Sequence, residues 1–352
     1  MTDMRVLSIG TDRALFDDGS ASRIRHEAYA KQFGSLDIIV FTSGNKTHVR
    51  AGALSVTPTN SVSRFLYGFD ALRIARKLPK PDVVTVQDPF ETGLTGWLIA
   101  RRLNVPLHVQ IHTDFFSPEF AKLSFLNRTR VWIAGFVLRR ASHIRVVSER
   151  IKKSIEEKYH LNVSVSVLPI FVDVAKFRNA EPLTDFSDDR ITNSAYKILV
   201  VSRDAPEKNI RLAVEAFKKA APDNACLILI GDIDVDNLSS RERIYGMGRS
   251  DPERYYKSAD LVLVPSKYEG YGLVIIEALA AGKPVLSTDV GIAREAGAIV
   301  TSPGGFADAL SEWFKNGPRE GHLVGYPYAN FEEYVQKYCA DIARCVTPVA
   351  VA

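Results

Sequence analysis

The chain has 352 residues, 46% of them apolar and 24% charged, which is the composition of a globular protein long enough for two domains. Its net charge of +4 is uneven, because residues 1–180 hold 26 Lys and Arg against 16 Asp and Glu, and the remainder holds 19 against 25. The first half is therefore expected either to meet an anionic partner or to present a solvated basic surface. We expect no nucleic-acid partner.

The chain is expected to be cytoplasmic. An apolar strand begins almost at once, so no signal peptide is predicted. The three cysteines lack metal-ligand spacing and are typical of thiols in a reducing compartment. The longest apolar run, residues 131–138, is far shorter than the roughly 20 residues that a membrane span needs. The helix predicted around it, residues 126–145, has arginines at both ends; it either leans on an anionic membrane or belongs to the core.

The first half alternates short β-branched runs with helical patterns. The runs are too apolar for a sheet with one wet face, so they predict a parallel sheet covered by helices on both sides. The predicted strands are residues 5–10, 36–43, 82–87, 106–113 and 143–148. The predicted helices include residues 64–78 and 91–103.

The same alternation returns after residues 167–195, a polar stretch that predicts an irregular linker. A second α/β unit follows, and an amphipathic helix over residues 330–345 ends the pattern. The predicted strands are residues 196–202, 225–231, 261–266 and 283–288. The predicted helices are residues 209–221, 251–259, 306–314 and a helix that begins at Leu273. Two such domains predict a ligand site in the cleft between them, at carboxyl ends of strands.

The stretch "EGYGLVIIEALAAGKPV" begins at Glu269 and combines a glycine turn with an apolar helix. Gly270 and Gly272 allow the backbone to approach a ligand closely. The helix start offers unpaired N–H groups and a positive dipole end, which is typical of a phosphate site. Glu277 lies one turn into the helix, where its carboxylate can accept hydrogen bonds from ribose hydroxyls. The local pattern predicts a nucleoside diphosphate.

Two glutamates separated by seven residues in this stretch resemble the signature of retaining glycosyltransferase family 4. "VVSRDAPEKNIRLAVEAF" (200–217) and "ASHIRVVSERIKKSIEEKY" (141–159) are similar to further family segments, and the resemblance covers about residues 85–300. It implies the GT-B fold, with two Rossmann-like doubly wound parallel-sheet α/β domains facing an interdomain cleft. The domains would be an acceptor-side domain over residues 1–175 and a donor domain over 176–329, with a C-terminal helix at about 330–352 packing back on the first.

The resemblance implies a metal-independent hexosyltransferase without a cofactor, which takes a UDP- or GDP-sugar and an unidentified glycan, lipid-linked or small-molecule acceptor. Glu277 would bind ribose, and Glu269 would contact the transferred sugar. Arg203 and Lys208 would neutralise the diphosphate, and His112 would lie near the reacting carbon. Further expected contacts are, on the donor side, Gly270, Tyr271, Gly272, Leu273, Gly246 and Met247, and, on the acceptor side, Gly19 and Ser20. Residues 244–250 would form a loop that reads the base.

Other functions fit parts of the pattern. A nucleotide-sugar binding protein without turnover needs the same donor contacts. An NAD-type α/β oxidoreductase needs a third glycine that "GMGRSD" lacks. The alternating aspartates of "GDIDVDN" (231–237) lack the Gly and Glu of a calcium loop, so we expect a solvated loop and no metal there.

Overall fold

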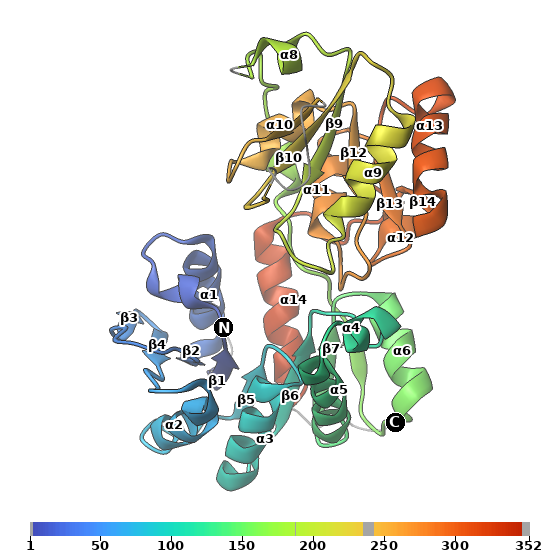
Figure 1. Ribbon diagram of the computed structural model, residues 1–352. Coiled ribbons are helices and arrows are strands. Elements are labelled where there is room, and N and C mark those ends of the chain that lie inside the picture. The colour runs from blue at the N-terminus through green and yellow to red at the C-terminus, as the bar shows by residue number, and fades with distance from the viewer. Residues whose placement is uncertain (1–2, 187, 235–242, 347–352) are drawn as a thin grey trace. The chain divides into compact units, whose positions relative to one another are not determined.

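The computed structural model describes residues 3–186, 188–234 and 243–346. The chain divides into two compact units (Figure 1). The first unit comprises the residues up to Pro169 together with those from Tyr328 onward, and the second unit comprises Ile170–Pro327. Of the stretch 231–237 that was weighed as a metal loop, residues 235–237 lie outside the described residues.

The first unit is an eight-stranded sheet with the order β3-β4-β2-β1-β5-β6-β7-β8. Its strands are β1 (Met4–Gly10), β2 (Gly34–Val40), β3 (Val49–Ala51), β4 (Leu54–Pro58), β5 (Val83–Val86), β6 (Leu107–Ile111), β7 (His143–Val146) and β8 (Val165–Val167). All neighbours pair in parallel except β3, which pairs antiparallel with β4. The expectation of a wholly parallel sheet is therefore wrong at this edge, where a short hairpin closes the sheet.

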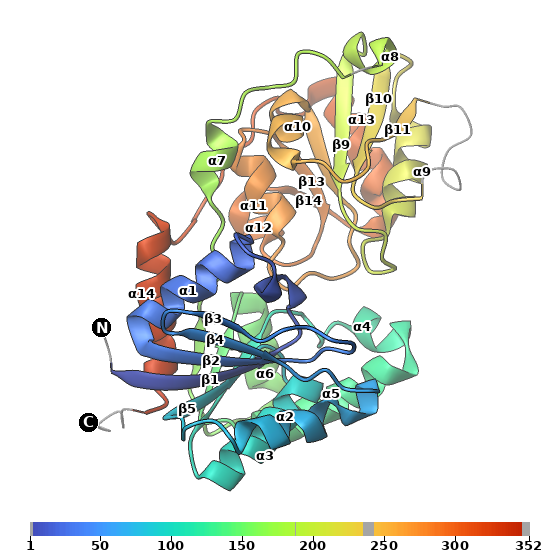
Figure 2. The ribbon, with the colours of Figure 1, turned by 90° about the vertical axis from the view of Figure 1, so that its left-hand side faces the viewer.

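Helices cover both faces of the first sheet. Figure 2 shows α2, α3 and α5 together beneath the sheet and α1 above it, and α14 packs beside α1. Because each residue of β5 and β7 is buried, both faces must be covered. The helices are α1 (Ala21–Phe33), α2 (Tyr67–Ala75), α3 (Glu91–Leu103), α4 (Pro118–Leu123), α5 (Phe125–Leu138), α6 (Glu149–Tyr159) and α14 (Phe331–Ala343), with 3-10 turns η1 (Arg13–Phe16) and η2 (Arg64–Leu66).

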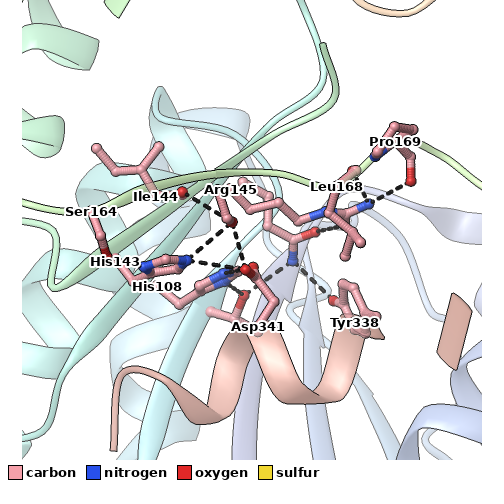
Figure 3. A network of polar contacts seen from close by, with 12 residues as sticks. His108, His143, Ile144, Arg145, Ser164, Leu168, Pro169, Tyr338 and Asp341 are labelled. Carbon is pink, nitrogen blue, oxygen red and sulfur yellow. Dashed lines mark hydrogen bonds and ion pairs between the residues drawn. The ribbon is translucent and has the colours of Figure 1, made fainter. Parts of the chain in front are cut away.

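The helix α14 is joined to the first sheet by a buried polar network (Figure 3). The Asp341 carboxylate is bonded to Nε2 of His108 and to Nε2 of His143, each at 3.1 Å. Beside them, the buried Arg145 guanidinium donates to Gln110 Oε1 at 2.7 Å and also bonds the Leu168 carbonyl. Side chains alternate between faces along a strand, so these polar groups of β6 and β7 all meet α14.

The second unit is a six-stranded parallel sheet with the order β11-β10-β9-β12-β13-β14. Its strands are β9 (Tyr196–Val201), β10 (Ala225–Ile230), β11 (Ile244–Gly246), β12 (Leu261–Val264), β13 (Val285–Thr288) and β14 (Ile299–Thr301). The first strand in the chain lies in the middle, and the chain then winds outward in both directions. This doubly wound arrangement confirms the predicted fold class and places the topological switch point between β9 and β12.

The helices of the second unit pack an apolar core on the sheet. Trp313 and Phe217, from α13 and α9, are among the largest buried side chains there. The helices are α7 (Val174–Arg178), α8 (Asp189–Thr192), α9 (Ile210–Ala220), α10 (Pro252–Ser258), α11 (Leu273–Ala280), α12 (Ala293–Ala296) and α13 (Phe306–Asn316), with the 3-10 turn η3 (Pro303–Gly305).

Two local predictions are wrong. Residues 167–195 are not irregular throughout, because they contain α7 and α8, whose first turns are capped by Asp173 and Asp188. Helices of four or five residues are too short to show apolar periodicity, so the capping residue is their only signal in the sequence. The start of the expected base-reading loop is the edge strand β11, which pairs with β10.

Candidate functional site

Two loops meet at the switch point of the second sheet. One loop joins β9 to α9 and carries Arg203 and Lys208, and the other joins β12 to α11 and carries Glu269. The Lys267 amide donates to the Glu207 carbonyl at 2.7 Å, which ties the loops together. The carboxyl edge beside a switch point is where open α/β sheets bind ligands. Residues that are far apart in the sequence are therefore brought to one place.

The centre of this site is an ion pair between Lys208 and Glu269. Lys208 Nζ lies 2.5 Å from Glu269 Oε1, and Ser266 Oγ donates to the same oxygen at 2.7 Å. The side chains of Lys208 and Glu269 are 21% and 16% exposed, so both are largely withdrawn from solvent yet reachable. In the structure, the cation predicted for the diphosphate and the carboxylate predicted for the sugar are partners.

Arg203 has a different partner from Lys208. Its Nη2 donates to Glu207 Oε1 at 2.6 Å, and its side chain is 72% exposed. Arg203 and Glu207 belong to the same loop, whereas Lys208 reaches across to the second loop. The two predicted cations thus share a loop but have different partners.

The helix α11 begins at Leu273, as predicted, directly after the glycine turn. Gly272 has a φ of +96° and provides no side-chain cap, so among the described residues the first amides of α11 are not capped by a side chain. A side chain at this φ would be strained, which explains the glycine. Leu273 is exposed, whereas the ring of Tyr271 is buried beneath the turn. An uncapped helix start of this kind favours an anion.

Glu277 has a partner that the sequence did not predict. The Tyr256 hydroxyl, on α10, donates to Glu277 Oε2 at 2.8 Å. Burial raises the pKa of Glu277, and the bond from Tyr256 and the charge of Lys176 partly oppose that rise. Nothing in the sequence points to Tyr256, because a tyrosine 21 residues away on another helix follows no local pattern.

The predicted base-reading residues lie where β11 ends. The Met247 amide donates to the Leu229 carbonyl at 2.9 Å, and the Met247 carbonyl accepts from Ser250 Oγ at 3.2 Å. Gly246 is exposed. The main chain of Met247 is therefore engaged within the protein, whereas Gly246 is exposed.

The predicted residues of the first unit lie at the carboxyl edge of its own sheet. His112 follows β6, and burial lowers its pKa to about 3, with the charges of Arg145 and Arg25 acting in the same direction. The imidazole is thus neutral at physiological pH. Ser20 caps α1 by accepting from the Arg23 amide at 3.2 Å, and its hydroxyl donates to the Ala14 carbonyl at 2.6 Å. Gly19, with a φ of +71°, forms the turn before it.

Sequence reasoning missed a buried carboxyl group near His112. Asp114 is 9% exposed, and its Oδ1 has no hydrogen-bond partner among the described residues. Burial raises the pKa of Asp114. The signal was available, because Asp114 comes two residues after His112, which directly follows β6, and is therefore placed at the same edge of the sheet.

One group among the described residues has the ligand chemistry of a metal site. The ligating atoms of His108, His143 and Asp341 lie within 4.8 Å of one another. The other imidazole nitrogens are also engaged, with Nδ1 of His108 bonded to Thr85 Oγ1 at 2.8 Å and Nδ1 of His143 bonded to Ser164 Oγ at 2.7 Å. The group is thus complete as the hydrogen-bonded network that holds α14.

Within the described ranges, we find no helix that combines the length and the apolar character needed to cross a membrane.

Two family models match the chain, one in each half. The model described as Glycosyltransferase Family 4 matches residues 27–176, and the model described as Glycosyl transferases group 1 matches residues 195–316. The chain belongs to glycosyltransferase family 4, and its two α/β units have the GT-B fold.

Curated relatives and solved structures are similar to the chain over most of its length. The alpha-monoglucosyldiacylglycerol synthase of Streptococcus pneumoniae is 29% identical over 64% of this chain and 56% of the relative. The UDP-Gal:alpha-D-GlcNAc-diphosphoundecaprenol alpha-1,3-galactosyltransferase of Escherichia coli is 26% identical over 61% of this chain and 59% of the relative. The matched region thus spans less than two thirds of these relatives.

Among solved structures, sucrose-phosphate synthase from Thermosynechococcus elongatus has a TM-score of 0.72 and 17% identity, and it covers 97% of both chains. Anabaena HepE in complex with UDP and glucose has a TM-score of 0.67 and 18% identity, covering 99% of this chain and 98% of that one. At these identities, the likeness shows the fold.

Proposed function

We propose that the protein moves a sugar from a nucleoside-diphosphate sugar to an acceptor hydroxyl, with retention of anomeric configuration. The observation that carries this proposal is the pairing of Lys208 with Glu269 beside the uncapped start of α11 at the switch point. UDP is the first donor nucleotide to test, because the fold neighbour HepE was solved with UDP and glucose. GDP is the alternative.

The proposed chemistry follows from the charges at this site. When a sugar–phosphate bond breaks, negative charge grows on the departing diphosphate, and fixed cations and helix amides stabilise it. Lys208 and the first amides of α11 would supply that stabilisation, with Arg203 turning in from Glu207. Glu269 would accept hydrogen bonds from hydroxyls of the transferred sugar. The pair holds both side chains in place before the donor arrives.

The state of His112 suits a place near the reacting carbon. Positive charge develops on the sugar ring as the bond breaks, and a neutral imidazole does not repel it. Because the pKa of His112 is lowered to about 3, the ring stays neutral throughout the physiological range. We propose that His112 makes a hydrogen bond to the sugar and acts neither as a cation nor as a general acid.

Metal and cofactor requirements belong to the same proposal. Protein cations and helix amides take the place that a divalent ion would have on the diphosphate. We therefore propose that transfer is independent of metal ions and of any cofactor. Transfer that stops in EDTA and returns with Mg²⁺ or Mn²⁺ would contradict this part.

We further propose that the first unit touches an anionic membrane, which favours a lipid-linked acceptor among the open choices. Two stretches of the first unit, one running from η2 into α2 and one along α5, expose large apolar side chains, namely Val62, Phe65, Leu66, Phe69, Phe125, Leu126 and Trp132. Exposed arginines flank them, including Arg64, Arg73, Arg128 and Arg140. Exposed apolar side chains with basic neighbours fit the boundary of an anionic bilayer. The names of both relatives, the Streptococcus pneumoniae synthase and the Escherichia coli galactosyltransferase, include a lipid.

The experiment is NMR observation of the protein with UDP-glucose, UDP-galactose and GDP-mannose, each with a lipid extract and with simple glycosides as acceptors. The proposal expects release of free nucleotide and a new anomeric signal with the configuration of the donor. Inverted configuration would contradict retention. Tight donor binding without turnover for any acceptor would favour the binding protein, and binding of NADH alone would favour an oxidoreductase.

A further inference from the structure

Glu277 lies in a small polar group that three helices of the second unit build. Its Oε2 accepts from Tyr256, and its neighbours are Lys176 on α7 and Glu253 on α10, which form an ion pair at 3.0 Å. The helix α11 packs against both α7 and α10. The carboxylate of Glu277, on an otherwise apolar helix, is thus surrounded by polar and charged side chains.

Among the described residues, the hydroxyl of Tyr256 bonds Glu277 alone. Its side chain is fully buried, and the ring packs edge to face on Phe177, with centroids 5.7 Å apart at 70°. Burial, together with the charge of Glu277, raises the pKa of Tyr256 well above 10, so the hydroxyl keeps its proton. The phenol is therefore a permanent donor to one carboxylate oxygen.

The second oxygen of Glu277 is the one left for a ligand. Oε1 accepts no hydrogen bond from the residues that the structure describes, whereas Oε2 is bonded to Tyr256. A free glutamate has three torsions to order, and ordering it during binding weakens the contact. A donor fixed on Oε2 sets the direction of Oε1 before a ligand arrives.

We propose that Tyr256 is a positioning residue that orients Glu277 and thereby makes the nucleotide site select ribose over 2′-deoxyribose. This inference rests on the proposed function, because it assigns the ribose end of the same donor. A ligand without the hydroxyl leaves a buried acceptor unpaired, and such sites reject the analogue strongly. The selection therefore depends on how well the carboxylate is held.

The test is isothermal titration of the full chain with UDP and 2′-deoxy-UDP, and with GDP and 2′-deoxy-GDP. Tyr256→Phe removes only the hydroxyl and keeps the ring on Phe177. Tyr255→Phe is the matched control, since Tyr255 is the adjacent residue of α10 and its ring faces Phe186. Glu277→Gln tests the carboxylate itself, and thermal unfolding verifies that each variant is folded.

We expect the wild type to prefer the ribonucleotide. In Tyr256→Phe, affinity for the ribonucleotide should fall about three- to tenfold, while affinity for the deoxynucleotide stays unchanged. Tyr255→Phe should match the wild type, and Glu277→Gln should lose the preference. An equal loss for both nucleotides in Tyr256→Phe, or a preference that survives in Glu277→Gln, would overturn this inference and leave the proposed function standing. A wild type that binds neither UDP nor GDP would overturn both.

Discussion

Lys208 Nζ and Glu269 Oε1 lie 2.5 Å apart, although 61 residues separate them in the chain. The contact joins the loops that follow the two central strands of the second sheet. A phosphate group bound at this edge would therefore share the ammonium of Lys208 with the carboxylate of Glu269.

Replacing either member of the ion pair should lower transfer, but for different reasons. Lys208→Ala should lower transfer roughly ten- to a few-hundred-fold, because hydrogen bonds to charged groups contribute about 1.5–3 kcal/mol. Glu269→Gln should lose transfer while its affinity for free UDP stays equal or rises, since the carboxylate no longer competes with phosphate for Lys208. Calorimetric titration with UDP and a transfer assay check both. Weaker UDP binding in Glu269→Gln would contradict the shared-ammonium account.

Arg203 is expected to matter for transfer and not for folding. Its side chain is exposed and its ion-pair partner belongs to the same loop, so Arg203→Ala should leave the unfolding temperature within about 1–2 °C of the wild type. Transfer should fall roughly tenfold or more. Arg211→Ala, which removes a similarly exposed arginine paired with Glu215 on α9, is the control. Equal activity in Arg203→Ala and Arg211→Ala would remove Arg203 from the site.

The longer strands of the second unit could be predicted because each has a local sequence pattern. Leu261–Val264 and Ala225–Ile230 are short continuous apolar runs, and both are wholly buried in the structure. The apolar character and the length of such a run suffice to predict a buried strand. The three-residue edge strands, such as Val165–Val167 and Ile299–Thr301, are too short to give a pattern. The hairpin at Val49–Ala51 was missed for the same reason.

The contacts of the site were harder to predict than its position. The glycine turn predicted where α11 begins, because the conformation of Gly272 is a local property. The two contacts of the site depend on how the loops and helices pack, and no local pattern predicts them. They are the contact of Lys208 with Glu269 and that of Tyr256 with Glu277. The polar face of β6 and β7 was readable as the alternation of His108 with Gln110, but the partner at Asp341 lies at the other end of the chain.

Removal of Asp341 should destabilise the first unit. Asp341→Ala leaves His108, His143 and Ser166 without their shared acceptor, and each buried polar group left unsatisfied costs about 1–3 kcal/mol. Glu332→Ala, in the exposed first turn of the same helix, is the control. Calorimetric unfolding should show a lower transition temperature for Asp341→Ala alone. Two variants that unfold like the wild type would show that the network does not anchor α14.

Mild acid should weaken the first unit through His26. Burial lowers the pKa of His26 to about 4, while an unfolded chain has a value near 6.5. Between these values the unfolded chain binds a proton that the folded chain does not, so the unfolding free energy falls as the pH falls. The loss is on the order of 3 kcal/mol when it is complete.

Denaturant unfolding at pH 7.5 and pH 4.5 measures this linkage. The advantage of the wild type over His26→Gln should shrink at the lower pH, because the variant has no imidazole to protonate. His48→Gln, at an exposed histidine, should keep the same difference from the wild type at both values. A constant difference for His26→Gln would refute the proposed role of His26.

The exposed apolar side chains of the η2–α2 stretch and of α5 predict lipid-dependent sedimentation. The wild type should sediment with vesicles that contain phosphatidylglycerol and should stay in solution with neutral phosphatidylcholine. Serine at both Phe65 and Trp132, which are 98% and 75% exposed, should lower the bound fraction severalfold, since each large side chain contributes about 1.5–3 kcal/mol when buried. Val324→Ser, at an exposed apolar residue of the second unit, is the control. Binding that ignores both the anionic lipid and the double substitution would exclude this surface.

The most direct test of the donor site is the unfolding temperature of the wild type and Lys208→Ala, measured with UDP and with GDP. A ligand at a hundred times its dissociation constant stabilises the folded state by about 2.7 kcal/mol. We predict a rise of several degrees for the wild type with at least one of these nucleotides and a much smaller rise for Lys208→Ala. Equal shifts in both proteins, or no shift in the wild type, would contradict a diphosphate site at the second switch point.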